Sequence, residues 1–342
     1  MFGIPSQIAF LKEFRRWVEA MCKAEVFTPV PGDAVMLSDY TALHNTVDSF
    51  DNPDHVELTP EYFQSSFSFP NVNLSDGFLL VRNDAGELIA AGTIFTEDNS
   101  SLISRLSVEV HPQYRHQGIG SEVLNRLIQI GLKRGSSEFA CMFPSFRPYA
   151  ATFLEKHGFS HDYMSLKMQT ELKTPGPVFP LPLGLTVRAL NIKKELATWA
   201  QLQNAIFRES SDYEAVNTEI LTSIVKHSAF DQSLLVIGTL FSKPIGYCLG
   251  FSMESAAKEK ILRIERIGVL PEFRRRGYGC ILVSEILIRA YIKEYVSSEL
   301  VVRSSDKSAI TLYEKCGFKE SYKHMWYKRR VVQPEKGRGE LG

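Results

Sequence analysis

VLPEFRRRGYG, residues 269–279, has an earlier counterpart in VHPQYRHQGIG, residues 110–120. Gly277 follows Gly118 by 159 residues, and TLYEKCGF at 311–318 follows TFLEKHGF at 152–159 by the same interval. A solenoid repeat is several times shorter than this period, which has the length of a whole domain. The chain therefore reads as a duplicated domain.

The length of 342 residues suits two domains. A proline-rich stretch at 173–184 is expected to be an extended linker, because proline removes a backbone donor and restricts the preceding residue. We expect a first domain at 1–172 that carries an extra amphipathic helix at about 6–24, a second domain at 185–332, and a polar tail at 333–342.

Charge and cysteine content exclude several classes of protein. Lys plus Arg and Asp plus Glu both number 39, and a balanced charge does not favour nucleic acid or an acidic membrane as a partner. The sequence has no apolar run long enough to span a bilayer, and its charged first helix is unlike a signal peptide. Five scattered cysteines without a CxxC pair predict neither disulfides nor a metal site, and favour a cytoplasmic location.

Hydrophobic patterning gives each half the same series of elements. Strands are expected at 78–95 and 234–251 as hairpins, at 102–110 and 261–269 before the glycine loops, and at 137–143 and 298–304 after the following helices. A short helix then ends near Gly158 or Gly317, where a left-handed residue is favoured. The predicted fold class is α/β (α+β), with a mixed, mostly antiparallel sheet flanked by helices in each half.

Each glycine loop stands between a strand and a helix. Glycine lets the backbone come close to a ligand, and a helix N-terminus presents unpaired N–H groups and partial positive charge, so the loop suits a pyrophosphate. A tight turn without a ligand is the alternative for a single copy. The chain lacks the GKS or GKT of a P-loop, and the loops lie too late in each half for a nicotinamide-binding fingerprint, which makes a dinucleotide oxidoreductase the weakest alternative.

The block VLPEFRRRGYG followed by LYEKCGF resembles the GCN5-related N-acetyltransferases (GNAT), and the first half carries a similar pair of motifs. The tandem arrangement is similar to bacterial two-domain acetyltransferases of the mycothiol synthase type, whose particular substrate is not carried over. The resemblance implies acetyl-CoA as co-substrate, without a metal. It implies cofactor contacts in the second half at Ile267, Gly268, Val269, Arg274, Arg275, Arg276, Gly277, Tyr278, Gly279 and Ser308. In the first half it implies contacts at Val108, Val110, Arg115, His116, Gln117, Gly118, Ile119 and Gly120.

The two halves differ at the positions that the resemblance makes catalytic. Tyr313 stands where many members keep an acid for the departing thiolate, and Glu265 stands where many keep a strand carboxylate as base. The first half has Leu154 and Leu106 there. A core tyrosine and a surface glutamate are the alternative interpretations. Regular strand alternation would place Glu265 on the same sheet face as Ile267. We expect an active second half.

The expected activity is transfer of acetyl from acetyl-CoA to an amine, with a degenerate acyl-CoA-binding or sensor module as the alternative. Acidic segments at 45–63 and 204–221 mildly suggest a cationic acceptor, and a solvated acidic surface explains them equally well. A small-molecule or peptide amine is the expected partner. The sequence leaves monomer and homodimer open.

Overall fold

The computed structural model describes residues 23–27, 34–52, 55–67, 77–96, 102–209, 215–255 and 257–331. The chain divides into two compact units. The N-terminal unit comprises Met1–Val56, Asn71–Asp162 and Met325–Gly342, and the C-terminal unit comprises Glu57–Pro70 and Tyr163–His324. Of the helix expected at 6–24, residues 6–22 lie outside the described residues, as does the tail at 333–342, and Lys23 and Ala24 begin a strand.

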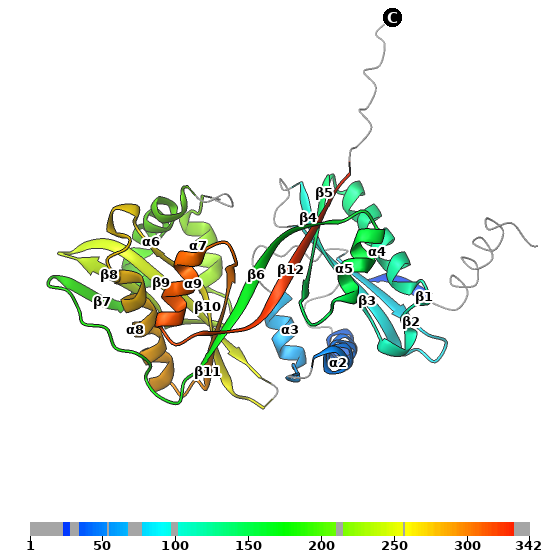
Figure 1. The fold of residues 1–342 in the computed structure, drawn as a ribbon, viewed down its shortest axis with the longest axis horizontal. Helices are drawn as coiled ribbons and strands as arrows, with labels where there is room; N and C mark the ends of the chain where they lie inside the picture. Colours follow the sequence, from blue (N-terminus) through cyan, green and yellow to red (C-terminus); the bar gives the residue numbers. More distant parts are fainter. Residues whose placement is uncertain are drawn as a thin grey trace, which may run out of the picture. The chain divides into compact units, whose positions relative to one another are not determined.

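The sheet of the N-terminal unit has the strand order β1-β2-β3-β4-β5-β12 (Figure 1). All pairs from β1 to β4 are antiparallel, and β4 and β5 are parallel. Helix α4 packs on one sheet face with Val123, Leu124 and Leu127, and helix α2 lies on the other. The elements are β1 (Lys23–Phe27), α2 (Ala34–Asp51), β2 (Phe78–Arg82), β3 (Leu88–Thr96), β4 (Ile103–Val110), η1 (Pro112–Tyr114), α4 (Ile119–Lys133), β5 (Glu138–Pro144) and α5 (Tyr149–Lys156).

The C-terminal unit repeats this plan with the order β6-β11-β10-β9-β8-β7. Strands β10 and β11 are parallel, helices α8 and α9 cover one face, and helices α6 and α7 cover the other. The elements are α3 (Pro60–Phe67), β6 (Ser160–Glu171), β7 (Leu185–Ala189), α6 (Ile192–Phe207), α7 (Thr218–Val225), β8 (Phe230–Leu240), β9 (Lys243–Glu254), β10 (Lys260–Val269), η2 (Pro271–Phe273), α8 (Tyr278–Ile292), β11 (Ser297–Arg303), α9 (Lys307–Lys315) and β12 (Lys319–Arg330).

Each sheet is completed by a strand from the other half of the sequence. Residues Ser165–Glu171 of β6 pair antiparallel with Ser297–Arg303 of β11 in the C-terminal unit. In the N-terminal unit, the end of β12 brings Tyr327 against Phe143, and the N–H of Val331 donates to the carbonyl of Ser137 at 2.8 Å. A strand edge that would otherwise be open is thereby paired in each sheet.

The predicted fold class is confirmed, since each unit is a mixed, mostly antiparallel sheet with helices on both faces. Both short helices end as expected, with Gly158 at φ +79° and Gly317 at φ +93°. Residues 173–184 contain no helix or strand. Within the described ranges, no helix is long and apolar enough to cross a membrane.

Candidate functional site

The two glycine loops have the same backbone conformation. Arg275 has φ +63° and Gly277 has φ +83°, while their counterparts His116 and Gly118 have φ +63° and +81°. Each loop follows a short 3-10 helix and ends at the glycine that caps the next α-helix. The duplication seen in the sequence is therefore also a duplication of loop geometry.

Both loops leave amide groups free at a helix N-terminus. The first backbone bond in α8 runs from Ile281 N to Gly277 O at 3.3 Å, so the N–H groups of Tyr278, Gly279 and Cys280 have no carbonyl one turn back. A Cβ at Gly277 would meet nothing within 4 Å, whereas a Cβ at Gly279 would meet Leu312 Cδ1 at 2.5 Å. Gly277 thus opens the loop to a ligand, and Gly279 permits close packing on α9. The arrangement fits a pyrophosphate.

The parallel strands beside each loop separate before the loop begins. Strand β10 pairs with β11 only over Ile261–Arg263, although it continues to Val269. Strand β4 pairs with β5 only over Ile103–Leu106 and continues to Val110. The last residues of β10 and β4 therefore lack a strand partner on that side, where the backbone of a pantetheine arm can pair.

A β-bulge at Glu265 distinguishes the C-terminal unit. Ile264 pairs with Gly250 and Arg266 pairs with Leu249, so Glu265 is the extra residue. Leu262 and Ile264 pack under α8 before the bulge, and Ile267 packs there after it. The expectation that Glu265 shares the face of Ile267 assumed unbroken alternation and is wrong on that ground. Glu265 is exposed at the bulge, and the registered pairs of β3 and β4 show no such shift.

Tyr313 lies at the inner face of α9, with 7% of its surface exposed. Its ring packs edge-on against Phe318 at 5.9 Å. Burial raises the pKa of the phenol, and the nearby Cys248 thiol adds to this. The side chain therefore keeps its proton near neutral pH, as a proton donor must. The counterparts Leu154 and Leu106 are buried in the core of the N-terminal unit and offer no proton.

The first arginine of each loop binds the protein itself. Arg274 donates through Nε to Val269 O at 3.0 Å and through Nη2 to Ile206 O at 2.8 Å. Arg115 donates through Nε to Val110 O at 3.2 Å and forms two 2.9 Å bonds to Asp51. These contacts hold the loop on its strand. Arg275 and Arg276 are exposed on the loop, and the Arg276 guanidinium lies over Phe273.

The other residues that were predicted to contact the cofactor differ in how deeply their side chains are buried. Tyr278 and Ile119 pack inward, so these two can offer a ligand only their backbone. His116 and Gln117 are exposed on the first loop. Ser308 donates to Asp306 Oδ1 at 2.9 Å, and Asp306 rather than Ser308 caps the N-terminus of α9. Gly120 is the second residue of α4, and the remainder lie on the strand ends: Val108, Val110, Ile267, Gly268 and Val269.

An ionic network in the N-terminal unit joins the end of α2 to the glycine loop and to residues 147–149. Asp51 is 4% exposed at its side chain and is bound by Arg115, Arg147 and the Tyr149 hydroxyl, the last at 2.6 Å. Asp48 pairs with Arg147 at 2.8 Å. These two acids of the 45–63 segment are thus neutralised within the protein. Since the partners lie up to 99 residues apart, sequence inspection missed the network.

A partly buried His–Glu pair joins α2 to β4 in the N-terminal unit. His44 Nδ1 is 2.8 Å from Glu109 Oε1, and Glu109 Oε2 is buried without a hydrogen-bond partner. Burial acts to lower the pKa of His44, but the Glu109 carboxylate outweighs it and the pKa is raised. Glu109 therefore helps to hold α2 on β4.

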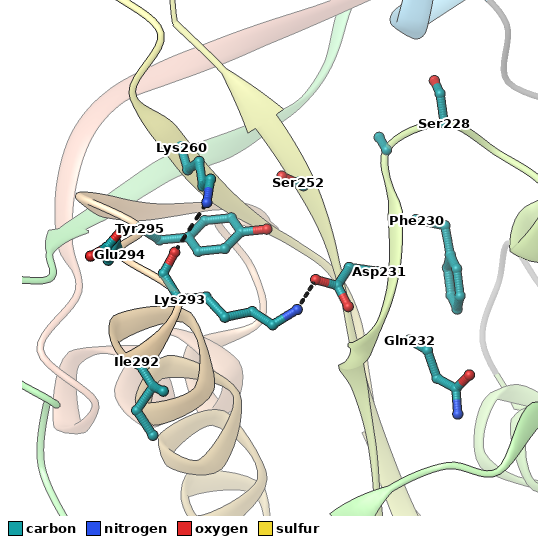
Figure 2. Close-up of a pocket in the computed structure, with 11 residues that line it drawn as sticks. Ser228, Phe230, Asp231, Gln232, Ser252, Lys260, Ile292, Lys293, Glu294 and Tyr295 are labelled. Atoms are coloured by element: carbon teal, nitrogen blue, oxygen red, sulfur yellow. Dashed lines mark hydrogen bonds and ion pairs between the residues drawn. The ribbon is translucent and has the colours of Figure 1, made fainter.

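A pocket of about 660 Å³ lies at the other end of α8 (Figure 2). It is lined by Ile292, Lys293 and Tyr295, and by Asp231 of β8 and Lys260 of β10, which both bind Lys293. Helix α8 has 15 residues, which separates this pocket from the glycine loop by about 20 Å. The pocket is therefore distinct from the glycine-loop site.

Comparison with known families matches both halves of the chain. The model of the acetyltransferase (GNAT) family aligns with residues 42–159 and again with 196–318, which covers both loops. The chain belongs to the GNAT family. The co-substrate of this family is acetyl-CoA, and the open loop at Gly277 fits that molecule.

Relatives with two GNAT domains are similar along most of the chain. The mycothiol acetyltransferase of Salinispora arenicola is 26% identical over 66% of this chain and 72% of its own length, and that of Thermobispora bispora is 25% identical over 74% and 83%. A GCN5-related N-acetyltransferase from Sphaerobacter thermophilus has a TM-score of 0.74 at 20% identity, covering 91% of this chain and 96% of its own. A tandem GNAT protein from the clavulanic acid biosynthesis pathway also scores 0.74, at 14% identity, over 92% and 100%. The last two similarities show the tandem fold.

Proposed function

We propose that this protein transfers the acetyl group of acetyl-CoA to an amine, and that the reaction takes place in the C-terminal unit. The observation that carries the proposal is the asymmetry between the units. Both have the glycine loop, but Glu265 and Tyr313 occur in one, where the other has Leu106 and Leu154.

The cofactor would lie along the end of β10, on the side that β11 leaves unpaired. The N–H groups at the start of α8 would bind the pyrophosphate, and the exposed Arg275 and Arg276 would neutralise it. Ile267 to Val269 would pair with the pantetheine arm. Arg274 has its donors on backbone carbonyls and would act by holding the loop.

The acceptor must reach the thioester as a neutral amine, because an ammonium has no lone pair. Glu265, directly or through a water molecule, would take the amine proton as the new C–N bond forms. A strand N–H would stabilise the oxyanion of the tetrahedral intermediate. As the C–S bond breaks, Tyr313 would give its proton to the CoA thiolate. The products are an amide and CoA with a free thiol.

The N-terminal unit would bind acetyl-CoA without turnover or support the acceptor site. The acceptor would be a small-molecule or peptide amine. We propose the cytoplasm as the location, because Cys141, Cys248, Cys280 and Cys316 are free and buried. Burial raises the pKa of Cys141 and of Cys316 to about 12, which suits packing residues rather than nucleophiles.

The proposal is tested by measuring free thiol released from acetyl-CoA in the presence of a panel of amines. Tyr313→Phe and Glu265→Gln are expected to lower kcat by about 10²-fold or more, with little change in the melting temperature. Tyr291→Phe and Glu285→Gln on α8 are matched controls, and both should keep the wild-type rate.

Two results would overturn parts of this proposal. If both Tyr313→Phe and Glu265→Gln kept the wild-type rate, the assignment of catalysis to the C-terminal unit would be wrong. Tight acetyl-CoA binding without transfer to any amine would favour an acyl-CoA sensor instead.

A further inference from the structure

A charged cluster lies on the sheet face opposite helix α8 in the C-terminal unit. Lys167, Arg263 and Glu299 come from β6, β10 and β11, three strands far apart in sequence. Their neighbours along each strand face α8, so alternation turns these three side chains to the other face. The neighbours in the α8 core are Leu166, Met168, Leu262, Ile264, Leu300 and Val302.

Glu299 is bound by both cations. Lys167 Nζ lies 2.8 Å from Glu299 Oε2, and Arg263 Nε lies 2.8 Å from Glu299 Oε1. Arg263 also donates to the Tyr62 hydroxyl at 3.2 Å. The side chains are 19%, 31% and 10% exposed for Lys167, Arg263 and Glu299. The cluster is therefore shielded but still reachable from solvent.

This cluster carries an excess of positive charge. It has two cations, and within the described residues Glu299 is the carboxylate paired with each of them. His324 of β12 adds no negative charge, and its Nδ1 is buried without a hydrogen-bond partner. Burial lowers the pKa of His324 to about 4, helped by Lys167 and Arg263, so the imidazole is neutral at pH 7. A single anion would balance the excess charge and offer the imidazole a partner.

The cluster lies along β10 from Ile267, the first of the residues that we propose to pair with the pantetheine arm. Arg263 precedes Ile267 by four residues on β10, and a strand rises about 3.3 Å per residue. The bulge at Glu265 shortens this path, so the separation is on the order of 10 Å. An α-amino acid is too short to join the two points through its own amine and carboxylate.

We propose that Lys167, Arg263 and His324 form a subsite for a carboxylate of the acceptor, and that this carboxylate lies on the order of 10 Å from the amine that is acetylated. The inference rests on the proposed function. It names the acceptor class as extended ω-amino acids or short peptides. The acidic segments mildly suggested a cationic acceptor. We now propose an acceptor that carries a carboxylate as well as the amine.

The test compares ligands that differ only in the carboxylate. Calorimetry in the presence of CoA would measure binding of N-acetyl-8-aminooctanoate and of N-octylacetamide, which are the products expected from 8-aminooctanoate and octylamine. We expect N-acetyl-8-aminooctanoate to bind the wild type at least about tenfold more tightly than N-octylacetamide. Equal affinities, or no measurable binding of the acid, would overturn the proposal.

Two variants separate an anion subsite from a purely structural cluster. Lys167→Met removes one positive charge and should reduce the preference for the acid about tenfold. Glu299→Gln removes the negative charge within the cluster and should increase the preference for N-acetyl-8-aminooctanoate over N-octylacetamide. Lys173→Met, on a side chain that is 81% exposed, is the control and should leave it unchanged. A structural role predicts that Lys167→Met and Glu299→Gln shift the preference in the same direction.

Turnover measurements keep this inference distinct from the proposed function. If the acid binds selectively but 8-aminooctanoate and the amine panel are not acetylated, the transfer reaction fails and the subsite stands. If 8-aminooctanoate and octylamine are acetylated with equal kcat/KM, the transfer reaction stands and the subsite fails.

Discussion

Replacing Gly277 by alanine isolates the contribution of the loop to ligand binding. The residue has φ +83°, and a Cβ there would meet nothing within 4 Å, so the substitution creates no clash in the protein. A left-handed conformation costs an alanine about 1–2 kcal/mol. Gly277→Ala should therefore lower the free energy of unfolding by about that amount, measured by urea denaturation.

The same methyl group would occupy space where an anion approaches the N–H groups of α8. We expect the dissociation constant for CoA, measured by calorimetry at that site, to rise about tenfold or more, which corresponds to about 1.4 kcal/mol. Gly118→Ala, at φ +81° in the N-terminal loop, should weaken CoA binding there while acetyl transfer in the C-terminal unit continues.

Gly86→Ala is the matched control, because Gly86 also has φ +83° with nothing within 4 Å of a Cβ and lies in the turn between β2 and β3. Gly86→Ala should lower the free energy of unfolding by the same amount and leave the dissociation constant for CoA unchanged. If Gly86→Ala and Gly277→Ala bind CoA equally well, the loop does not hold the pyrophosphate and the reasoning fails.

Two further predictions concern the dependence of stability on pH. Burial acts to raise the pKa of Glu299, but Arg263 and Lys167 outweigh it and lower the pKa from 4.5 to about 2. The resulting stability, about 3 kcal/mol, is present above pH 4.5 and is lost as the pH falls towards 2. Between pH 4.5 and 2, Glu299→Gln should lose less stability than the wild type in acid unfolding. An identical acid profile would contradict this contribution of Glu299. The raised pKa of His44 has the opposite sign, so the stability from its pair with Glu109 is present below pH 6.5 and is lost as the pH rises above it. Thermal melts at pH 6 and 9 should therefore differ more in the wild type than in His44→Gln, and equal differences would refute this contribution.

Features that depend on neighbours in sequence were predictable. The two loops, their helices and the left-handed residues Gly158 and Gly317 follow from the chemistry of glycine at a helix end. The contrast between Tyr313 and Leu154 is also visible in the aligned repeats. These features need only short-range spacing to be recognised.

Features that depend on the tertiary structure were missed or were wrong. The face of Glu265 was inferred from regular alternation, but the pairing of β10 with β9 inserts a bulge at that residue. The ion pair of Arg115 with Asp51, 64 residues away, was missed. The exchange of β6 and β12 was also missed, because strand pairing depends on contacts between segments that are distant in sequence.

The sequence by itself determined that a domain is duplicated, that each copy has a glycine bend at the start of a helix, and that the first copy has Leu106 and Leu154 where the second has Glu265 and Tyr313. Residues a few positions apart encode the bend, since backbone conformation and helix capping act locally, and the constant offset of 159 residues reveals the duplication. Only the tertiary structure decided which cations face inward and which carboxylate joins them. Lys167, Arg263 and Glu299 are brought together by strand pairing between distant segments, and that register depends on the packing of the whole sheet.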